Sequence, residues 1–204
     1  MAKHLENKYE NEYWAKDQYV MGIDEAGRGP LCGPLVVACC ILPINYQNDE
    51  INDSKQLTEK KRNELFKVII KDAHYFSFKI ISPSEIDESN IYAVTKKAMN
   101  ELSISSKLHS VTLTDAMPLN RFDVIDMIKG DAQSISIAAA SILAKVLRDH
   151  IMDGYNVLLP QYEYNKNRGY CTKRHLQLMD EYGLNHLYRM SYKPCKDRAE
   201  IKLF

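Results

Sequence analysis

Four carboxylates could do chemistry together, because each stands at or just beyond the end of an apolar stretch: Asp24, Glu25, Asp115 and Asp131. In α/β proteins ligands gather at strand ends and in the adjoining loops, so we expect several of these acids to converge. Two carboxylates about 4 Å apart repel by roughly 4 kcal/mol at an effective dielectric constant near 20. Such a cluster must take up protons or bind cations.

Hard divalent cations suit this set of acids, since it contains no cysteine or histidine pair at metal-ligand spacing. Mg²⁺ or Mn²⁺ held by carboxylates indicates phosphoryl chemistry, in which two ions activate a water and stabilise the leaving oxygen. The alternative is that isolated acids at strand ends are solvated turn residues or helix caps. Asp131 is the weakest candidate by this reasoning, because it could simply begin the following helix.

The segment GIDEAGRGP places Arg28 between Gly27 and Gly29, directly after the first acid pair. Glycines permit backbone geometry and close approach that side chains would block. Backbone N–H and C=O groups exposed there could contact a sugar hydroxyl or a phosphate. The alternative is a tight hairpin turn, for which glycines are equally useful. The neighbouring Asp24–Glu25 pair favours the binding interpretation.

The C-terminal region is locally basic on a neutral chain, with nine Lys or Arg and five Asp or Glu between residues 162 and 204. Within it, Tyr170 lies among amide and basic side chains, and a ring beside cations is a common way to grip nucleic acid. The alternative is a solvated basic helix with Tyr170 as a core aromatic. Further candidate phosphate contacts, which could equally be ordinary surface charges, are Lys55, Lys145 and Arg148.

Composition narrows the class of protein. The chain has 204 residues, 45% hydrophobic and 26% charged, which is typical of a folded globular protein. Its 27 basic and 27 acidic residues balance, which argues against coating of polyanions by bulk charge. Its five cysteines form no C-x-x-C pair, and no apolar stretch is long enough for a membrane span. We therefore expect a soluble cytoplasmic protein that does not interact with membranes.

The pattern of apolar residues predicts an α/β fold with a mixed sheet, followed by a helical C-terminal segment. The expected strands cover residues 19–24, 34–42, 75–81, 110–114 and 123–128. The expected helices cover residues 57–73, 82 to about 102, 134–152 and 172–182, before a basic tail. No long linker divides the chain. We expect a single domain over 1–204, with 1–18 a charged N-terminal extension and about 155–204 a helical segment.

Several motifs together resemble those of ribonuclease HII, the type 2 ribonuclease H family. They are GIDEAGRGPLCGP at 22–34, NDSKQLTEKKR at 52–62, LTDAMPL at 113–119, KGDAQSISIAAASILAKVLRD at 129–149 and NRGYCTKRH at 167–175. These segments follow one another in the family's order, and the first and fourth are long. Two positions depart from the common pattern: Ala116 stands where many members have glycine, and Tyr192 where phenylalanine is common.

The resemblance implies a ribonuclease H-like catalytic domain, in which a central mixed sheet is flanked by helices and the C-terminal helical region grips the substrate. It implies a four-carboxylate metal site at Asp24, Glu25, Asp115 and Asp131, which makes Asp131 a ligand. It also implies that Gly27, Arg28 and Gly29, together with Tyr170, recognise the 2′-hydroxyl at an RNA to DNA junction. That hydroxyl distinguishes RNA from DNA on the sugar.

The expected activity is that of an endoribonuclease using two Mg²⁺ or Mn²⁺ ions. The substrates would be RNA/DNA hybrids and duplex DNA containing embedded ribonucleotides, cut on the 5′ side of the ribonucleotide to leave 3′-hydroxyl and 5′-phosphate ends. We expect a monomer, and the sequence identifies no protein partner. Three alternatives stay open: the related ribonuclease HIII, against which the short N-terminus and the glycine motif argue, a non-catalytic nucleic-acid binding module, and a metal-dependent phosphatase of small esters.

Overall fold

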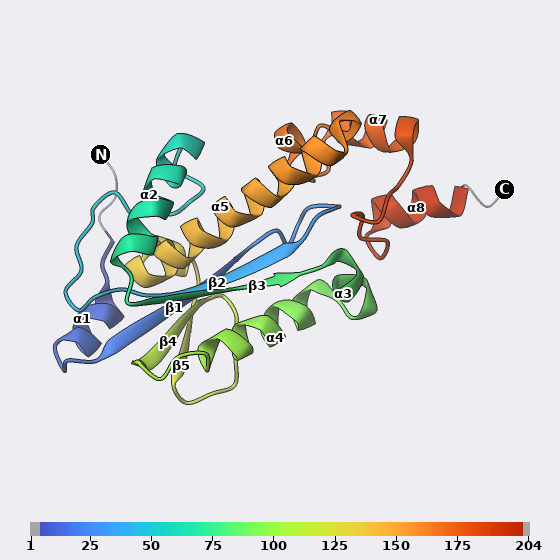
Figure 1. Ribbon diagram of the computed structural model, residues 1–204. Helices are drawn as coiled ribbons and strands as arrows, with labels where there is room; N and C mark the ends of the chain where they lie inside the picture. The colour runs from blue at the N-terminus through green and yellow to red at the C-terminus, as the bar shows by residue number, and fades with distance from the viewer. Residues whose placement is uncertain (1–4, 202–204) are drawn as a thin grey trace. The chain divides into compact units, whose positions relative to one another are not determined.

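The computed structural model describes residues 5–201 (Figure 1). The chain divides into two compact units, each of which we describe by itself. The first unit comprises the chain up to Ala26, then Val37–Lys79 and Thr95–Val146. The second unit comprises Gly27–Val36, Ile80–Val94 and the chain from Leu147 onwards. The single catalytic domain over 1–204 stays a prediction.

A five-stranded mixed sheet organises the first unit, with the strand order β3-β2-β1-β4-β5. The strands are β1 (Tyr19–Ala26), β2 (Leu35–Ile41), β3 (Tyr75–Ile81), β4 (His109–Asp115) and β5 (Val124–Met127). The β1–β4 and β4–β5 pairs are parallel, so these three strands end at the same edge of the sheet. All five predicted strands are present, and the predicted central mixed sheet flanked by helices is confirmed.

Helices cover both faces of this sheet (Figure 1). On one face lie α2 (Glu59–Asp72) and the first half of α5 (Ile135–Leu158), and on the other lies α4 (Ile91–Ser103). The contact between β1 and α5 is close, because a Cβ atom built on Gly22 would lie 2.1 Å from the backbone of Ser136. No side chain fits at that position, so Gly22 lets α5 pack directly against the strand that carries Asp24.

Residues 82 to about 102 do not form the single helix that was predicted. The capping box of Ser82 and Glu85 begins α3 as expected, but α3 ends at Glu88 (Pro83–Glu88). The Asn90 side chain then accepts a hydrogen bond from the Ala93 N–H at 2.8 Å, which is the N-cap of a new helix, α4. Asparagine competes well for this role, and it divides the helical pattern at that point.

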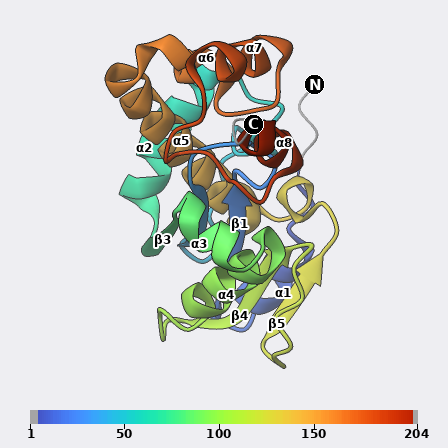
Figure 2. The ribbon, with the colours of Figure 1, turned by 90° about the vertical axis from the view of Figure 1, so that its right-hand side faces the viewer.

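The second unit has its own core, built around the second half of α5, a 3-10 turn (Pro160–Tyr162) and three short helices. These are α6 (Tyr164–Asn167), α7 (Lys173–Tyr182) and α8 (Lys193–Ile201). Figures 1 and 2 show α6 and α7 together near the C-terminal end of α5. The buried core residues are Leu31, Cys32, Met152, Tyr162, Tyr164, Met179, Leu187, Tyr188 and Cys195. The pattern predicted α7, but it did not predict α8 within the basic tail.

The charged N-terminal extension is partly structured. Residues 1–4 lie outside the described residues, but α1 (Lys8–Trp14) packs into the first unit with Glu10 and Trp14 buried. Burial of an acid in a segment dense in charge was not predicted. Among the helices within residues 5–201, none has the length and apolar character needed to cross a bilayer.

Candidate active site

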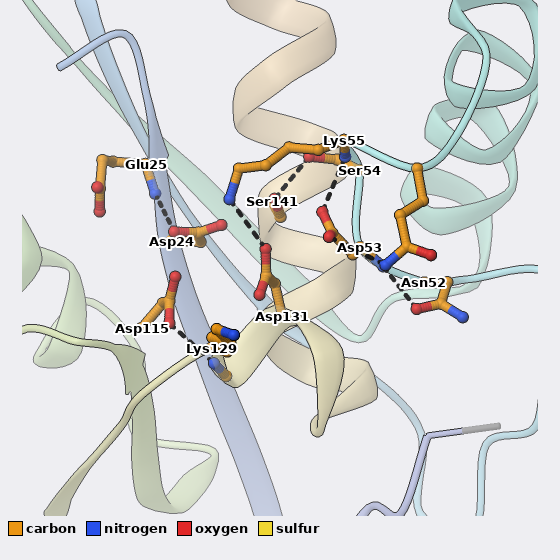
Figure 3. Close-up of polar contacts among 12 residues, drawn as sticks. Asp24, Glu25, Asn52, Asp53, Ser54, Lys55, Asp115, Lys129, Asp131 and Ser141 are labelled. Atoms are coloured by element: carbon orange, nitrogen blue, oxygen red, sulfur yellow. Dashed lines mark hydrogen bonds and ion pairs between the residues drawn. The ribbon is translucent and has the colours of Figure 1, made fainter. Parts of the chain in front are cut away.

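Three of the four predicted acids converge in the first unit (Figure 3). Asp24 lies near the end of β1, Asp115 ends β4, and Asp131 lies in a 3-10 turn (Gly130–Ala132) just before α5. One carboxylate oxygen from each lies within 4.8 Å of those of the others. Because β1 and β4 are parallel neighbours, their carboxyl ends bring two of these acids to the same edge of the sheet.

Backbone hydrogen bonds hold the acids in place. An Asp115 carboxylate oxygen accepts the Gly130 N–H at 2.8 Å, which ties the end of β4 to the turn that carries Asp131. After Asp115 the chain turns sharply, with Ala116 at a φ of 48°. Glycine adopts this left-handed conformation more readily than alanine does. Alanine is accommodated there with its N–H donating to the Met127 carbonyl at 2.9 Å.

Glu25 does not join the other three acids in this structure. Figure 3 shows its carboxylate directed away from them. The physical reason is that successive side chains of a strand point to opposite faces, and Asp24 and Glu25 are neighbours in β1. The predicted convergence of four acids is therefore corrected to three, and a metal-binding role for Glu25 stays a prediction.

Electrostatics in the cluster disfavours isolated negative charges. Burial raises the pKa of Asp24 well above its usual value, and the charges of Glu25 and Asp115 raise it further. Burial also raises the pKa of Asp131, with contributions from Asp115 and Asp53 that Lys55 opposes. Three buried or half-buried acids with oxygen donors this close fit a hard divalent cation, which would compensate their charge.

Lys55 reaches this cluster, with its Nζ 3.3 Å from a carboxylate oxygen of Asp131. Its side chain is 78% exposed, whereas that of Asp131 is 5% exposed. Partial burial lowers the pKa of Lys55, but the charge and hydrogen bond of Asp131, together with the charges of Asp24 and Asp53, outweigh burial and raise it. The loop that carries Lys55 is anchored to α5 by a hydrogen bond between the hydroxyls of Ser54 and Ser141 at 2.9 Å. The predicted phosphate contact of Lys55 is untested, and so is that of Lys145, which is half-buried in α5.

In the second unit, the glycine motif and Tyr170 lie against each other. Gly27 has a φ of 104°, and a Cβ there would lie 2.3 Å from the Arg148 side chain, so only glycine fits. A Cβ on Gly29 would lie 3.9 Å from the Tyr170 ring. Arg28 and Gly29 are exposed, and Tyr170 is 44% exposed. The structure thus forms an accessible surface from residues that the sequence analysis grouped as substrate-binding.

Arg148 requires a correction, because its side chain is fully buried. Its guanidinium donates hydrogen bonds to three backbone carbonyls, those of Pro34, Arg168 and Cys32, at 3.0 to 3.3 Å. It also lies 5.9 Å from the centre of the Tyr170 ring. A guanidinium held in this way is not available to a phosphate, so the predicted direct contact is wrong. Arg148 instead shapes the loop that contains the glycine motif.

Arg189 has a similar role that sequence reasoning missed. This second fully buried arginine donates to the carbonyls of Gly27 at 2.7 Å, Arg28 at 3.1 Å and Gly33 at 2.9 Å. The Tyr192 hydroxyl also donates to the Arg28 carbonyl, at 2.7 Å. The carbonyl partners of Arg189 lie far away along the chain, so no local pattern distinguished it from the solvated basic residues of the tail. The hydroxyl that separates Tyr192 from the commoner phenylalanine therefore makes a bond to the motif.

His175 is another missed residue, and it orients the Tyr170 backbone. Its Nδ1 lies 2.9 Å from the Tyr170 carbonyl, and its Nε2 lies 2.9 Å from the Tyr188 hydroxyl. A carbonyl can only accept, so Nδ1–H donates to Tyr170 and Nε2 accepts from Tyr188. Burial lowers the pKa of His175, in keeping with this neutral form.

Comparisons with known proteins agree with this picture. Residues 21–195 match the profile of the family Ribonuclease HII. Ribonuclease HII of Listeria innocua is 46% identical over 200 residues, which covers 96% of this chain and 77% of the relative. The crystal structure of ribonuclease H2 from Pyrococcus horikoshii matches with a TM-score of 0.77 and 25% identity, covering 90% of this chain and 98% of the other.

A structure of Bst-RNase HIII in complex with Mn²⁺ matches with a TM-score of 0.73, covering 90% of this chain and 70% of the other. Its 15% identity supports the fold alone. The family match over most of the chain sets aside the alternatives of ribonuclease HIII, a non-catalytic binding module and a small-ester phosphatase. The chain belongs to the ribonuclease HII family and is a ribonuclease H, a metal-dependent nuclease of a family that acts on RNA/DNA hybrids.

Proposed function

We propose that the chain hydrolyses the phosphodiester on the 5′ side of a ribonucleotide, in RNA/DNA hybrids and in duplex DNA with embedded ribonucleotides. The products would carry 3′-hydroxyl and 5′-phosphate ends. The observation that carries this proposal is the cluster of Asp24, Asp115 and Asp131, with carboxylate oxygens within 4.8 Å of one another. Two Mg²⁺ or Mn²⁺ ions bound there would lower the pKa of an attacking water and stabilise the leaving oxygen.

In this proposal each acid has a distinct task. Asp24 and Asp131 are buried and supply metal ligands. Asp115 supplies a ligand while its other oxygen keeps the Gly130 N–H, and so keeps the turn of Asp131 in place. Glu25 is the proposed fourth ligand, which requires its carboxylate to turn toward the cluster from the direction that Figure 3 shows, and its charge already acts on Asp24. The exposed ammonium of Lys55, beside Asp131, is positioned to bind a substrate phosphate, and Lys145 is proposed as a second phosphate contact.

Substrate selection is proposed to lie in the second unit. The backbone of Gly27, Arg28 and Gly29 would hydrogen-bond the 2′-hydroxyl, and the exposed ring of Tyr170 would pack against the sugar at the junction. The proximity of Gly29 to the Tyr170 ring supports this assignment, because a Cβ atom at Gly29 would already lie 3.9 Å from the ring.

A DNA duplex with one ribonucleotide, labelled at either end of the cut strand, tests the reaction. We expect cleavage on the 5′ side of the ribonucleotide with Mg²⁺ or Mn²⁺, none after chelation, and none in the all-DNA duplex. A DNA polymerase should extend the 3′ end, and a ligase should accept the 5′ end. A cut on the 3′ side, or ends that resist both enzymes, would contradict the proposed chemistry.

Replacement of single acids tests the assignment of the site. Asp24→Asn and Asp131→Asn should each reduce cleavage by more than about 100-fold. Removing a residue that only hydrogen-bonds a metal ligand can reduce activity by up to about 100-fold, so loss of the ligand itself should cost more. Binding of an RNA/DNA hybrid, measured by fluorescence anisotropy, should persist in both variants. Retained cleavage in both would remove the cluster from the mechanism.

A further inference from the structure

The N-terminal extension contacts the segment that follows Asp131, and these contacts have no part in the activity described above. The Asn7 N–H donates to the Gln133 carbonyl at 3.0 Å, and the Asn7 side chain accepts the Ile135 N–H at 2.8 Å. Glu10, in α1, accepts the Ser134 hydroxyl at 2.5 Å and the Ser136 N–H at 3.1 Å. Two residues of the extension therefore hold the start of α5.

Glu10 is an unusual choice for this position, because its side chain is completely buried. Buried acids are rare unless their charge is compensated. Here the N-terminus of the long helix α5 offers that compensation through its N–H groups and dipole. The second carboxylate oxygen of Glu10, Oε2, has no hydrogen-bond partner among the described residues. The Ser134 hydroxyl already accepts the Ile137 N–H at 3.1 Å, so α5 has a cap of its own and Glu10 holds that cap in place.

The same segment determines where Asp131 lies. The Gly130 carbonyl accepts the N–H groups of Gln133 at 3.0 Å and Ser134 at 2.9 Å, so the turn carrying Asp131 is closed upon Ser134. On its other side, the Gly130 N–H donates to Asp115. The turn is therefore held between Asp115 and Glu10, and a shift of Ser134 must shift Gly130 and Asp131 with it.

We infer that Glu10 is a positioning residue for Asp131, so that the N-terminal helix determines how well the acid cluster binds divalent metal. This inference rests on the proposed role of Asp131 as a metal ligand. Outer partners that orient metal ligands commonly change metal affinity or activity by about 10- to 100-fold when they are removed. Glu10 acts through hydrogen bonds to Ser134 and Ser136 rather than by touching the metal.

Mn²⁺ binding to the purified full chain, measured by isothermal titration calorimetry, is the direct test. We expect Glu10→Ala to weaken Mn²⁺ binding by roughly 10-fold. Glu10→Gln should recover much of the loss, because its amide oxygen can accept the same two hydrogen bonds. The Mg²⁺ concentration for half-maximal cleavage should rise in parallel, whereas kcat at saturating Mg²⁺ should stay near that of the unmodified protein.

Ser82→Ala is the matched control, since it removes a comparable helix cap from α3 in the second unit. It should lower the melting temperature and leave Mn²⁺ affinity unchanged. If Glu10→Ala behaves in the same way, Glu10 only stabilises the fold and the inference is wrong. If Glu10→Ala does not fold, Asn7→Gly decides by the same criterion, because it removes the hydrogen bond from the Ile135 N–H, and glycine tolerates the φ of 47° at this position.

Asp131→Asn separates the two proposals. If this variant binds Mn²⁺ as well as the unmodified protein does, the proposed ligand role of Asp131 fails. If Asp131→Asn loses affinity and neither Glu10 variant does, only the positioning role of Glu10 is wrong.

Discussion

The ionised carboxylate of Asp24 is suited to bind a metal ion but is unfavourable for the stability of the metal-free fold. Asp24 is 4% exposed, and both burial and the charges of Glu25 and Asp115 raise the pKa of its carboxyl group. An ionised Asp24 therefore destabilises the metal-free fold, although the ionised form is the one that binds a cation. In the proposed mechanism the oxygens of this unfavourable group serve as metal ligands at the end of β1.

The stability of the metal-free protein should depend on pH for this reason. A carboxyl group whose pKa is higher in the folded than in the unfolded state destabilises the fold at pH values above its folded pKa. That destabilisation should be relieved as the pH falls from the raised value toward the usual value near 4. Asp24→Asn should reduce this pH dependence, of which Asp131 with its own raised pKa keeps a part, and should stabilise the metal-free protein near neutral pH.

Urea unfolding in the presence of a chelator, between pH 4 and pH 8, measures both effects. Each pKa unit corresponds to 1.36 kcal/mol. The difference in unfolding free energy between the two proteins therefore measures how far the pKa of Asp24 is raised. An Asn variant that is less stable than the unmodified protein at neutral pH would show that the hydrogen bonds of Asp24 outweigh its unfavourable burial.

Tyr170 provides a second prediction at the scale of one residue. Its ring is 44% exposed, so Tyr170→Ala should change the free energy of unfolding little. Cleavage at a single embedded ribonucleotide should fall more than cleavage of a continuous hybrid, because the ring is proposed to contact the junction sugar. Tyr170→Phe is the control that keeps the ring. An equal ratio of the two activities in the Ala variant would remove Tyr170 from substrate selection.

At the scale of elements, the loop between β1 and β2 is held by residues from two distant segments. Arg148 in α5 and Arg189 before α8 together donate to backbone carbonyls along Gly27–Pro34. The loop contributes Leu31 and Cys32 to the core of the second unit, and charged hydrogen bonds to its carbonyls hold the remainder of its backbone in place. The proposed recognition surface is therefore produced by packing within the second unit.

Arg189→Ala should destabilise the protein by about 3 kcal/mol or more, because it leaves several buried carbonyls without donors. It should also reduce selectivity for the ribonucleotide junction. Tyr192→Phe, which removes only one hydrogen bond to the Arg28 carbonyl, should cost about 1 kcal/mol and preserve selectivity. Denaturant unfolding and cleavage of paired substrates measure these effects. Full selectivity in a folded Arg189 variant would show that the loop keeps its shape without this residue.

At the scale of the whole molecule, a chain with formal net charge +0 belongs to a family that acts on polyanions. Affinity for a duplex must therefore come from local positive groups, since balanced charge supplies no general attraction. Lys55 is such a group, with an exposed ammonium, whereas the charge of Arg148 is buried among carbonyls. Solvent exposure of the side chain, which the sequence does not give, distinguishes Lys55 from Arg148.

The salt dependence of hybrid binding distinguishes these roles. Each phosphate contact lowers the slope of log K against log salt concentration by about 0.9 for duplex DNA. Lys55→Ala should reduce the magnitude of the slope by about one and weaken binding of all sequences alike. Arg148→Met, which removes the charge, should leave the slope unchanged and lower stability instead. A reduced slope for Arg148→Met would restore its predicted phosphate contact.

The sequence by itself was sufficient for the five strands, the acids at their ends and the glycine motif. These are local features: β-branched runs form strands, and an acid directly after such a run must lie at a strand end. The break between α3 and α4 depended on Asn90, whose capping ability competes with a helical pattern that continues past it. The direction of the Glu25 side chain follows the alternation of side chains along β1. The family motif instead led us to expect Glu25 beside Asp24 in the acid cluster.

Tertiary structure alone decided which charged groups face the solvent. Nothing near Arg148, Arg189 or Glu10 in the sequence distinguishes them from solvated residues, yet all three are fully buried. Their partners lie more than 100 residues away along the chain, except for the bond of Arg148 to Arg168 and that of Arg189 to Tyr192. A buried charge is tolerable only where folding assembles its hydrogen-bond partners, and no local pattern records that assembly.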